Sequence, residues 1–127
     1  MAQVLMFNIA EDKRQKIGFA AWKLGIAVHS VPAEDFAHPV GYLLGLEGFS
    51  PAADAPEAFT EEMLLMHALS SAQFSGFLDA LRRSRVPVAL KAVATGHNLG
   101  WSSAALCREL RREHEAMKRA GKSAHGK

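Results

Sequence analysis

Side chains that could bind or react are concentrated in two short segments of the chain, 67–71 and 95–101. The first segment holds a histidine and two serines, and the second holds a threonine, a histidine, an amide and an indole. Histidine exchanges a proton near neutral pH, and hydroxyl and amide groups can hold a polar ligand. The candidate residues are His67, Ser70, Ser71, Thr95, His97, Asn98 and Trp101.

Each of these segments follows a run with the pattern of a strand. We expect strands near 3–8, 27–31, 63–68 and 88–95, with amphipathic helices between the first two and between the last two. The third and fourth strands are expected to run in the same direction, so their C-terminal ends lie at one edge of the sheet. The two segments would meet there and form a pocket for a small anion or polar ligand.

Turn chemistry explains several of the candidates without a ligand. Thr95 and Asn98 are turn-forming residues whose side chains bond nearby backbone groups. Trp101 precedes a helix that Ser102 can cap, and an apolar residue at that position packs against the first turn of the helix. We therefore assign no catalytic residue, and we expect a binding domain rather than an enzyme.

Metal and cofactor sites are not indicated. None of the six histidines lies four residues from another, and Cys107 is the only cysteine. A single cysteine also excludes an intrachain disulfide, which is typical of a reducing compartment. No apolar run approaches the ~20 residues of a membrane span. We expect a cytoplasmic protein with no cofactor and no membrane partner.

An internal sequence similarity at an offset of 60 residues indicates a duplicated fold. Leu5-Met6 corresponds to Leu65-Met66, and Ile17 corresponds to Phe77. Each copy reads as a strand, an amphipathic helix and a second strand. The sequence predicts a single α/β domain over residues 1–120, a two-layer sandwich with a four-stranded sheet whose first and third strands are central because they are apolar on both faces.

Two topologies satisfy this pattern. The duplication favours a ferredoxin-like sheet with strand order 4-1-3-2. The long connection 32–61, in which a helix is expected near 39–46, favours a parallel flavodoxin-like sheet with order 2-1-3-4. The stretch 48–60 contains proline, alanine and acidic residues and is expected to be a mobile loop.

The C-terminal part of the chain is basic. Residues 108–127 contain seven lysines and arginines and three glutamates. A helix is expected to begin after Ser102 and to end at Gly121, which leaves 121–127 as a disordered basic tail.

The run from Val88 to Ser102 resembles a bacterial family known only as domain of unknown function number 3783. That family shows a Leu-Lys-Ala-Val strand followed by a turn with threonine, asparagine and tryptophan, and Lys91, Thr95, Asn98 and Trp101 match it. The resemblance covers roughly residues 60–117. It implies an α/β domain, and it implies no activity because none is attached to the family.

Three functions are compatible with the sequence. The first is a non-catalytic regulatory domain that binds a small molecule or a protein, with a homodimer as one arrangement. The second is a small enzyme in which His67 or His97 acts as the acid or base. The third is a weak nucleic-acid binder that uses the basic C-terminal helix, although the rest of the chain is slightly acidic.

Overall fold

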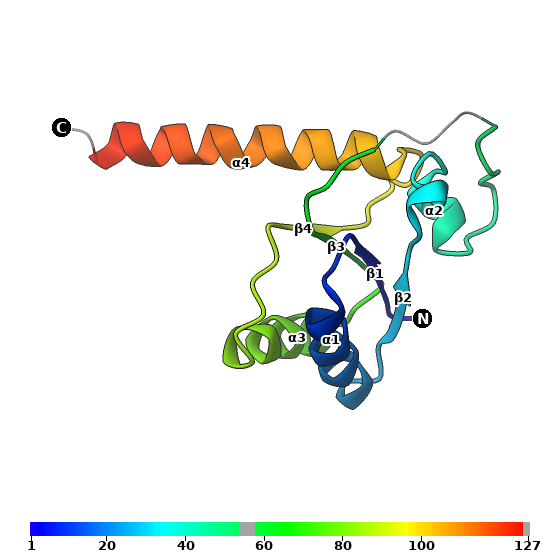
Figure 1. The fold of residues 1–127 in the computed structure, drawn as a ribbon, viewed down its shortest axis with the longest axis horizontal. Coiled ribbons are helices and arrows are strands. Elements are labelled where there is room, and N and C mark those ends of the chain that lie inside the picture. The colour runs from blue at the N-terminus through cyan, green and yellow to red at the C-terminus, as the bar shows by residue number, and fades with distance from the viewer. Residues whose placement is uncertain (54–57, 126–127) are drawn as a thin grey trace.

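The computed structural model describes residues 1–53 and 58–125 (Figure 1). The strands are β1 (Gln3–Phe7), β2 (Ala27–Ser30), β3 (Met63–His67) and β4 (Leu90–Val93). The helices are α1 (Glu11–Lys23), α2 (Val40–Leu43), α3 (Ser71–Arg83) and α4 (Ser103–His125), with a 3-10 turn at Ala33–Asp35. These bounds lie close to the predicted ones, and α2 falls within the helix expected near 39–46. None of the described helices is long and apolar enough to cross a lipid bilayer.

The four strands form one mixed sheet with the order β2-β1-β3-β4. β1 and β3 are central and β2 and β4 are at the edges, as the apolar pattern predicted. β2 runs parallel to β1 and β4 parallel to β3, but β1 and β3 are antiparallel. The strand order 2-1-3-4 is the one expected for the flavodoxin-like alternative, but the antiparallel β1–β3 pair means that the sheet is not fully parallel. The ferredoxin-like order 4-1-3-2 is wrong, because each strand–helix–strand unit keeps its two strands adjacent.

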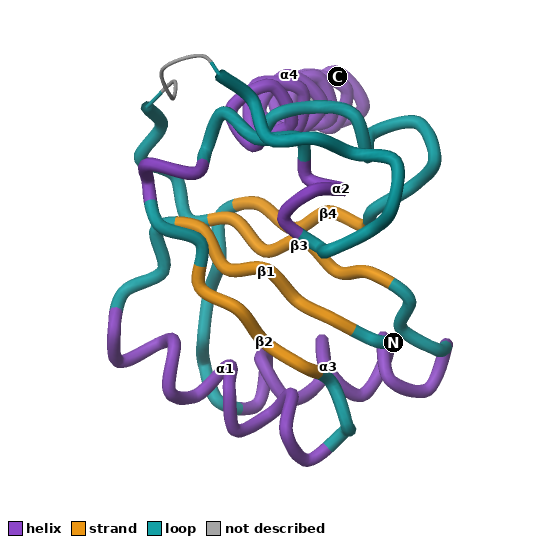
Figure 2. Tube along the Cα trace, turned by 90° about the vertical axis from the view of Figure 1, so that its right-hand side faces the viewer, coloured by secondary structure: helices purple, strands orange, loops and turns teal. Residues whose placement is uncertain are grey.

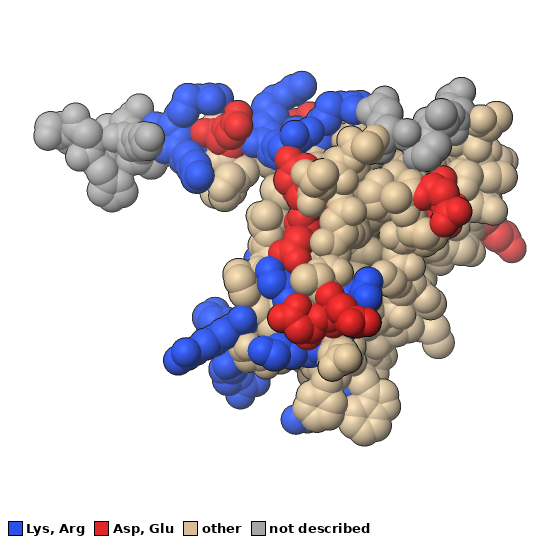
Figure 3. All heavy atoms as spheres, in the orientation of Figure 1, with Lys and Arg blue, Asp and Glu red and all other residues tan. Residues whose placement is uncertain are grey.

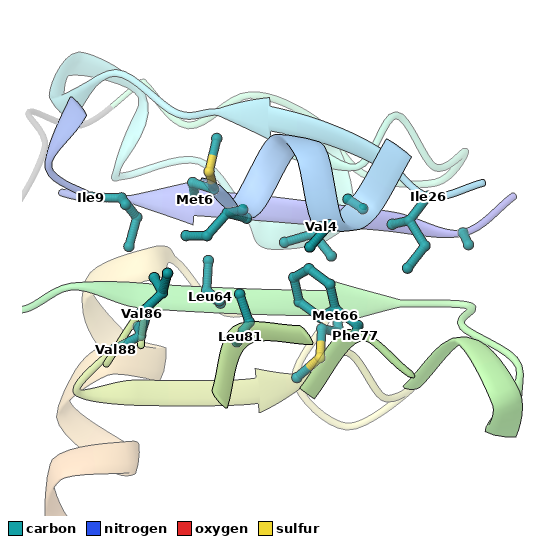
Figure 4. Close-up of a cluster of buried hydrophobic side chains, with 14 residues drawn as sticks. Val4, Met6, Ile9, Ile26, Leu64, Met66, Phe77, Leu81, Val86 and Val88 are labelled. Atoms are coloured by element: carbon teal, nitrogen blue, oxygen red, sulfur yellow. The ribbon is translucent and has the colours of Figure 1, made fainter. Parts of the chain in front are cut away.

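The sheet is covered on both faces, which corrects the expected two-layer sandwich to three layers. α1 and α3 cover one face, and α2 with the start of α4 covers the other (Figure 2). The core under α1 and α3 contains Val4, Leu64 and Phe77 (Figure 4). The core on the opposite face contains Leu5 and Leu65. Neighbouring residues of one strand thus pack into different cores, as expected of a strand that alternates its side chains between faces.

The two halves of the sheet are related by an approximate two-fold axis. Leu5 of β1 lies opposite Leu65 of β3, and these two residues are equivalent under the offset of 60. The backbone after each central strand repeats as well, since Asn8 and Ala68 both have a positive φ, of 57° and 62°. The sequence similarity at an offset of 60 residues therefore corresponds to a structural repeat.

The repeat extends beyond the second strand of each half, with a slightly larger offset. Pro39, just before α2, forms an isolated antiparallel bridge with Ser102, just before α4. The Val40 N–H donates to the Trp101 carbonyl at 2.8 Å, and the Ser103 N–H donates to the Phe36 carbonyl at 3.2 Å. We call β1 to α2 the first repeat and β3 to α4 the second repeat.

The last helix is longer than the sequence predicted. α4 continues through Gly121 to His125, whereas we expected it to end at Gly121 and the tail to be disordered. A glycine inside a helix costs only about 1 kcal/mol relative to alanine, and no proline follows it. Residues 126–127 lie outside the described residues.

One residue of the stretch expected to be a mobile loop, Phe59, packs into the core. Phe59 is 9% exposed and stacks on Phe36, with 4.5 Å between the ring centroids. Residues 54–57 of this stretch lie outside the described residues.

Candidate functional site

The C-terminal ends of β3 and β4 lie side by side, but the predicted site residues line two separate hollows. The serine hollow has a volume of about 370 Å³ and is lined by Met66, Ala68, Leu69, Ser70, Ser71, Phe74, Ser75 and Val93. The tryptophan hollow, also of about 370 Å³, is lined by Lys91, Ala92, Val93, Thr95, His97, Asn98, Trp101, Leu106, Glu109, Leu110 and Glu113. Val93 is the residue common to both linings.

The Ser70 hydroxyl caps the N-terminus of α3. It accepts a hydrogen bond from the Gln73 N–H at 3.1 Å, and the Gln73 side-chain oxygen accepts from the Ser70 N–H at 2.9 Å. This reciprocal pair is a capping box. A ligand in the serine hollow would compete with this bond for the Ser70 hydroxyl, whereas Ser71 is exposed beside it.

Thr95 and Asn98 stabilise the turn that follows β4. The Thr95 N–H donates to Asn98 Oδ1 at 2.9 Å, and the Asn98 N–H donates to Thr95 Oγ1 at 3.3 Å. Asn98 Nδ2 also donates to the Val93 carbonyl at 3.1 Å, and the asparagine is only 8% exposed. Both side chains are therefore occupied by the local fold, as their turn chemistry indicated.

The two candidate histidines are not brought into one pocket. His97 lines the tryptophan hollow and makes an edge contact with Trp101, with 5.2 Å between the ring centroids. His67 lines neither hollow, and its Nδ1 is buried without a hydrogen-bond partner among the described residues. The two histidines therefore do not act in one hollow, and an enzyme would have to use His67 or His97 without the other.

Cys107 is fully buried beside a carboxylate. Its thiol lies 3.6 Å from Glu61 Oε1, and Arg111 forms an ion pair with Glu61 at 2.9 Å. Burial, followed by the Glu61 charge, raises the pKa of Cys107 from 9.0 to about 11. A hydrogen bond to its own backbone, followed at smaller weight by the Arg111 charge, lowers the pKa of Glu61. The thiol is protonated at neutral pH and is a packed residue.

Sequence reasoning missed a third and larger hollow, which we call the α3 groove. It has a volume of about 670 Å³ and lies between α3, the turn after it and the start of β4. Its lining consists of Leu78, Leu81, Arg82, Arg85, Val86, Pro87 and Lys91. The groove could not be found from spacing, because it joins a helix face to a strand edge that only the folded chain brings together.

The α3 groove combines apolar walls with cationic side chains. Arg82 is exposed and forms an ion pair with Asp79, and Lys91 Nζ lies 3.3 Å from the Val88 carbonyl. Arg85 is exposed and forms no ion pair among the described residues. A group of lysine and arginine side chains is visible over α3 in Figure 3. The groove can therefore accept an apolar group that carries a negative charge.

The hollows are not accompanied by a cluster of metal ligands. Within residues 1–53 and 58–125, no group of three histidine, cysteine, aspartate or glutamate side chains could hold a metal ion.

Comparison with known proteins finds one family model that matches a segment of the chain. Residues 62–117 match the sequence profile of a domain of unknown function, DUF3783. No curated protein and no solved structure matches the chain. The matched segment begins just before β3 and ends within α4, so it covers most of the second repeat and contains all three hollows.

Proposed function

We propose, from the premise that residues 62–117 form a DUF3783 domain of unknown function, that this chain is a non-catalytic binding module. Its binding surface is the α3 groove, and its ligand combines an apolar part with a negative charge. The observation that carries the proposal is the composition of the groove: four apolar residues form its walls, and Arg82, Arg85 and Lys91 border it.

The size of the α3 groove supports this proposal. Small-molecule sites are typically hollows of roughly 300–1,000 Å³, mostly apolar, with a few polar groups that orient the ligand. At about 670 Å³ the groove is the largest of the three hollows. The charges also favour an anionic ligand, since Arg85 and Lys91 would repel a positively charged one, whereas the charge of Arg82 is partly offset by Asp79.

The second repeat carries two of these cations where the first repeat has none. The positions equivalent to Arg82 and Arg85 in the first repeat hold Trp22 and Gly25. The two repeats share their strands and helices, so the charges are not required by the fold. Both arginines lie in residues 62–117, the segment that the family model matches.

The alternatives receive less support from the geometry. A histidine-based enzyme lacks a shared pocket for His67 and His97. A nucleic-acid site on α4 is weakened because Arg111 and Arg112 are paired with Glu61 and Glu109.

The proposal is tested with two probes of equal apolar length and opposite charge. Dodecanoate and dodecyltrimethylammonium are each titrated below their micelle concentrations into the isotopically labelled chain, and backbone amide shifts are followed by NMR. Dodecanoate is expected to shift amides of residues 78–91, and the cationic probe is not. A double variant, Arg85→Gly with Lys91→Ala, should weaken dodecanoate binding about tenfold, which corresponds to about 1.4 kcal/mol.

The matched control keeps the charges, with Arg85→Lys and Lys91→Arg in one chain. It should bind dodecanoate nearly as well as the parent. The proposal fails if both probes shift the same amides equally, or if neither shifts the amides of residues 78–91.

A further inference from the structure

β4 is an edge strand whose outer side is open. Among the described strands only β3 pairs with it. The Leu90 N–H donates to the Glu62 carbonyl at 3.1 Å, and the Ala94 N–H donates to the Met66 carbonyl at 2.8 Å. Backbone groups alternate along a strand, so the N–H groups of the residues at 91 and 93 point away from the sheet.

Side chains alternate between the two faces of the sheet along this edge, although Lys91, Ala92 and Val93 all border the tryptophan hollow. Lys91 borders the α3 groove and Val93 borders the serine hollow, and both residues pair with β3 residues whose side chains face the α1–α3 core. Ala92, between them, borders the tryptophan hollow and packs into the core on the opposite face. An added strand projects side chains at i and i+2 to one face and i+1 to the other.

The outer flank of α3 presents apolar surface beside the same edge. Phe74 and Leu78 are one turn apart on the helix and are only partly buried, and each lines one of the two hollows on this face. Val93 of β4 is 47% exposed. Side chains of a neighbouring strand would cover these three residues.

We propose that the edge of β4 binds an extended segment of a partner protein as an additional strand, an inference that rests on the proposed binding role of the α3 groove. Recognition by strand addition takes its affinity from backbone hydrogen bonds and its specificity from pockets for alternate side chains. Here the bonds are made by the Lys91 N–H and carbonyl and the Val93 N–H. The Val93 carbonyl already accepts from Asn98 Nδ2, so the ladder is short.

The charges on the two faces define the partner. On the α3 face Arg82, Arg85 and Lys91 select an acidic or apolar side chain. On the α4 face the tryptophan hollow contains Glu113 and Glu109, the second of which is paired with Arg112, and these carboxylates favour a basic side chain. The partner segment therefore carries acidic or apolar residues at alternate positions, with a basic residue between them.

A second copy of the chain fits this edge less well. In a pair of β4 strands about a two-fold axis, each copy would meet the same α3 groove, whose lining holds cations and no acidic side chain. An acidic segment would neutralise these cations, whereas a second copy would not.

The test uses a display library of random short peptides selected against the full chain. We expect enriched peptides with the alternating pattern, and their binding should shift the amides at 91 and 93. The decisive comparison is between two N-methylated forms of one enriched peptide. Methyl groups on one alternate set of amides should weaken binding by at least tenfold, because those N–H groups form the ladder, and methyl groups on the other set should have little effect.

The parallel titration with dodecanoate separates the two proposals. If dodecanoate binds and no peptide is enriched, or if both N-methylated forms bind equally well, strand addition is refuted and the groove remains a small-molecule site. If neither probe binds, both proposals fail. Sedimentation that shows a dimer which Val93→Lys dissociates would instead assign the edge to a second copy of the chain.

Discussion

At the scale of single residues, the two repeats place different residues at a turn whose backbone has a positive φ. Gly25 and Arg85 occupy equivalent turns after α1 and α3, with φ values of 75° and 56°. Glycine adopts this conformation without steric cost, but an arginine is strained there by roughly 1–2 kcal/mol. The Arg85 side chain lines the α3 groove, which gives this strained position a part in the proposed binding surface.

Arg85→Gly is therefore expected to stabilise the chain while it weakens anion binding. The relief of strain exceeds the added entropy of the unfolded glycine, so the free energy of unfolding should rise by about 0.5 kcal/mol. Urea denaturation measures the change. The reciprocal control, Gly25→Ala, introduces strain and should destabilise by about 1 kcal/mol. A loss of stability in Arg85→Gly would contradict this account of the turn.

Cys107 gives a prediction for alkaline pH. Its pKa is about 11 in the folded chain against 9.0 for an unperturbed cysteine side chain, so the folded state holds the proton more tightly. The resulting stabilisation is complete below pH 9.0 and is lost as the pH rises towards about 11. Cys107→Ala should show a smaller loss of stability across this window, measured by urea denaturation at successive pH values. Identical pH profiles for the two chains would show that the thiol is not perturbed.

At the scale of elements, sequence predicted which segments form the sheet but not how they are directed. The apolar runs of β1 and β3 identify central strands, because both faces of a central strand are buried. The same runs are compatible with either direction, since reversing a strand leaves its alternation unchanged. The antiparallel direction of β3 beside β1 is a tertiary property, which the side-chain pattern does not encode.

The candidate site was predicted only in part for the same reason. The parallel course of β3 and β4 was expected, and Thr95 and Asn98 form the turn that their chemistry indicated. The division of the polar residues between two hollows was not predicted, because it depends on which face of β4 each one reaches. The α3 groove depends on how α3 and the turn after it pack beside the start of β4, which is a tertiary property.

The capping box of α3 gives a prediction at this scale. Ser70→Ala removes the acceptor for the Gln73 N–H and should lower the free energy of unfolding by about 1 kcal/mol. Ser71→Ala is the matched control, since this neighbouring serine is exposed in the first turn and its loss should change stability by less than about 0.5 kcal/mol. Chemical denaturation of both variants provides the comparison, and equal effects would exclude the cap as the cause.

At the scale of the whole molecule, the two repeats share one sheet and are expected to unfold together. Leu5 and Leu65 are both fully buried at the centre of the β1–β3 pair. Leu5→Ala and Leu65→Ala should each cost about 2–5 kcal/mol. Native-state hydrogen exchange should then show the same loss of protection in β1 and β3, whichever leucine is changed. Loss confined to the repeat that carries the substitution would mean that the repeats unfold independently.

The projection of α4 gives the molecule an uneven shape in solution. From Arg111 to Ala120 every residue of the helix is exposed, and Figure 1 shows this part extending away from the sheet. A helix of 23 residues is about 35 Å long. A compact chain of 127 residues has a radius of gyration of about 14 Å. X-ray scattering should therefore give a radius of gyration larger than about 14 Å and a distance distribution with a long tail. A value of about 14 Å would mean that the exposed part of α4 lies against the rest of the molecule.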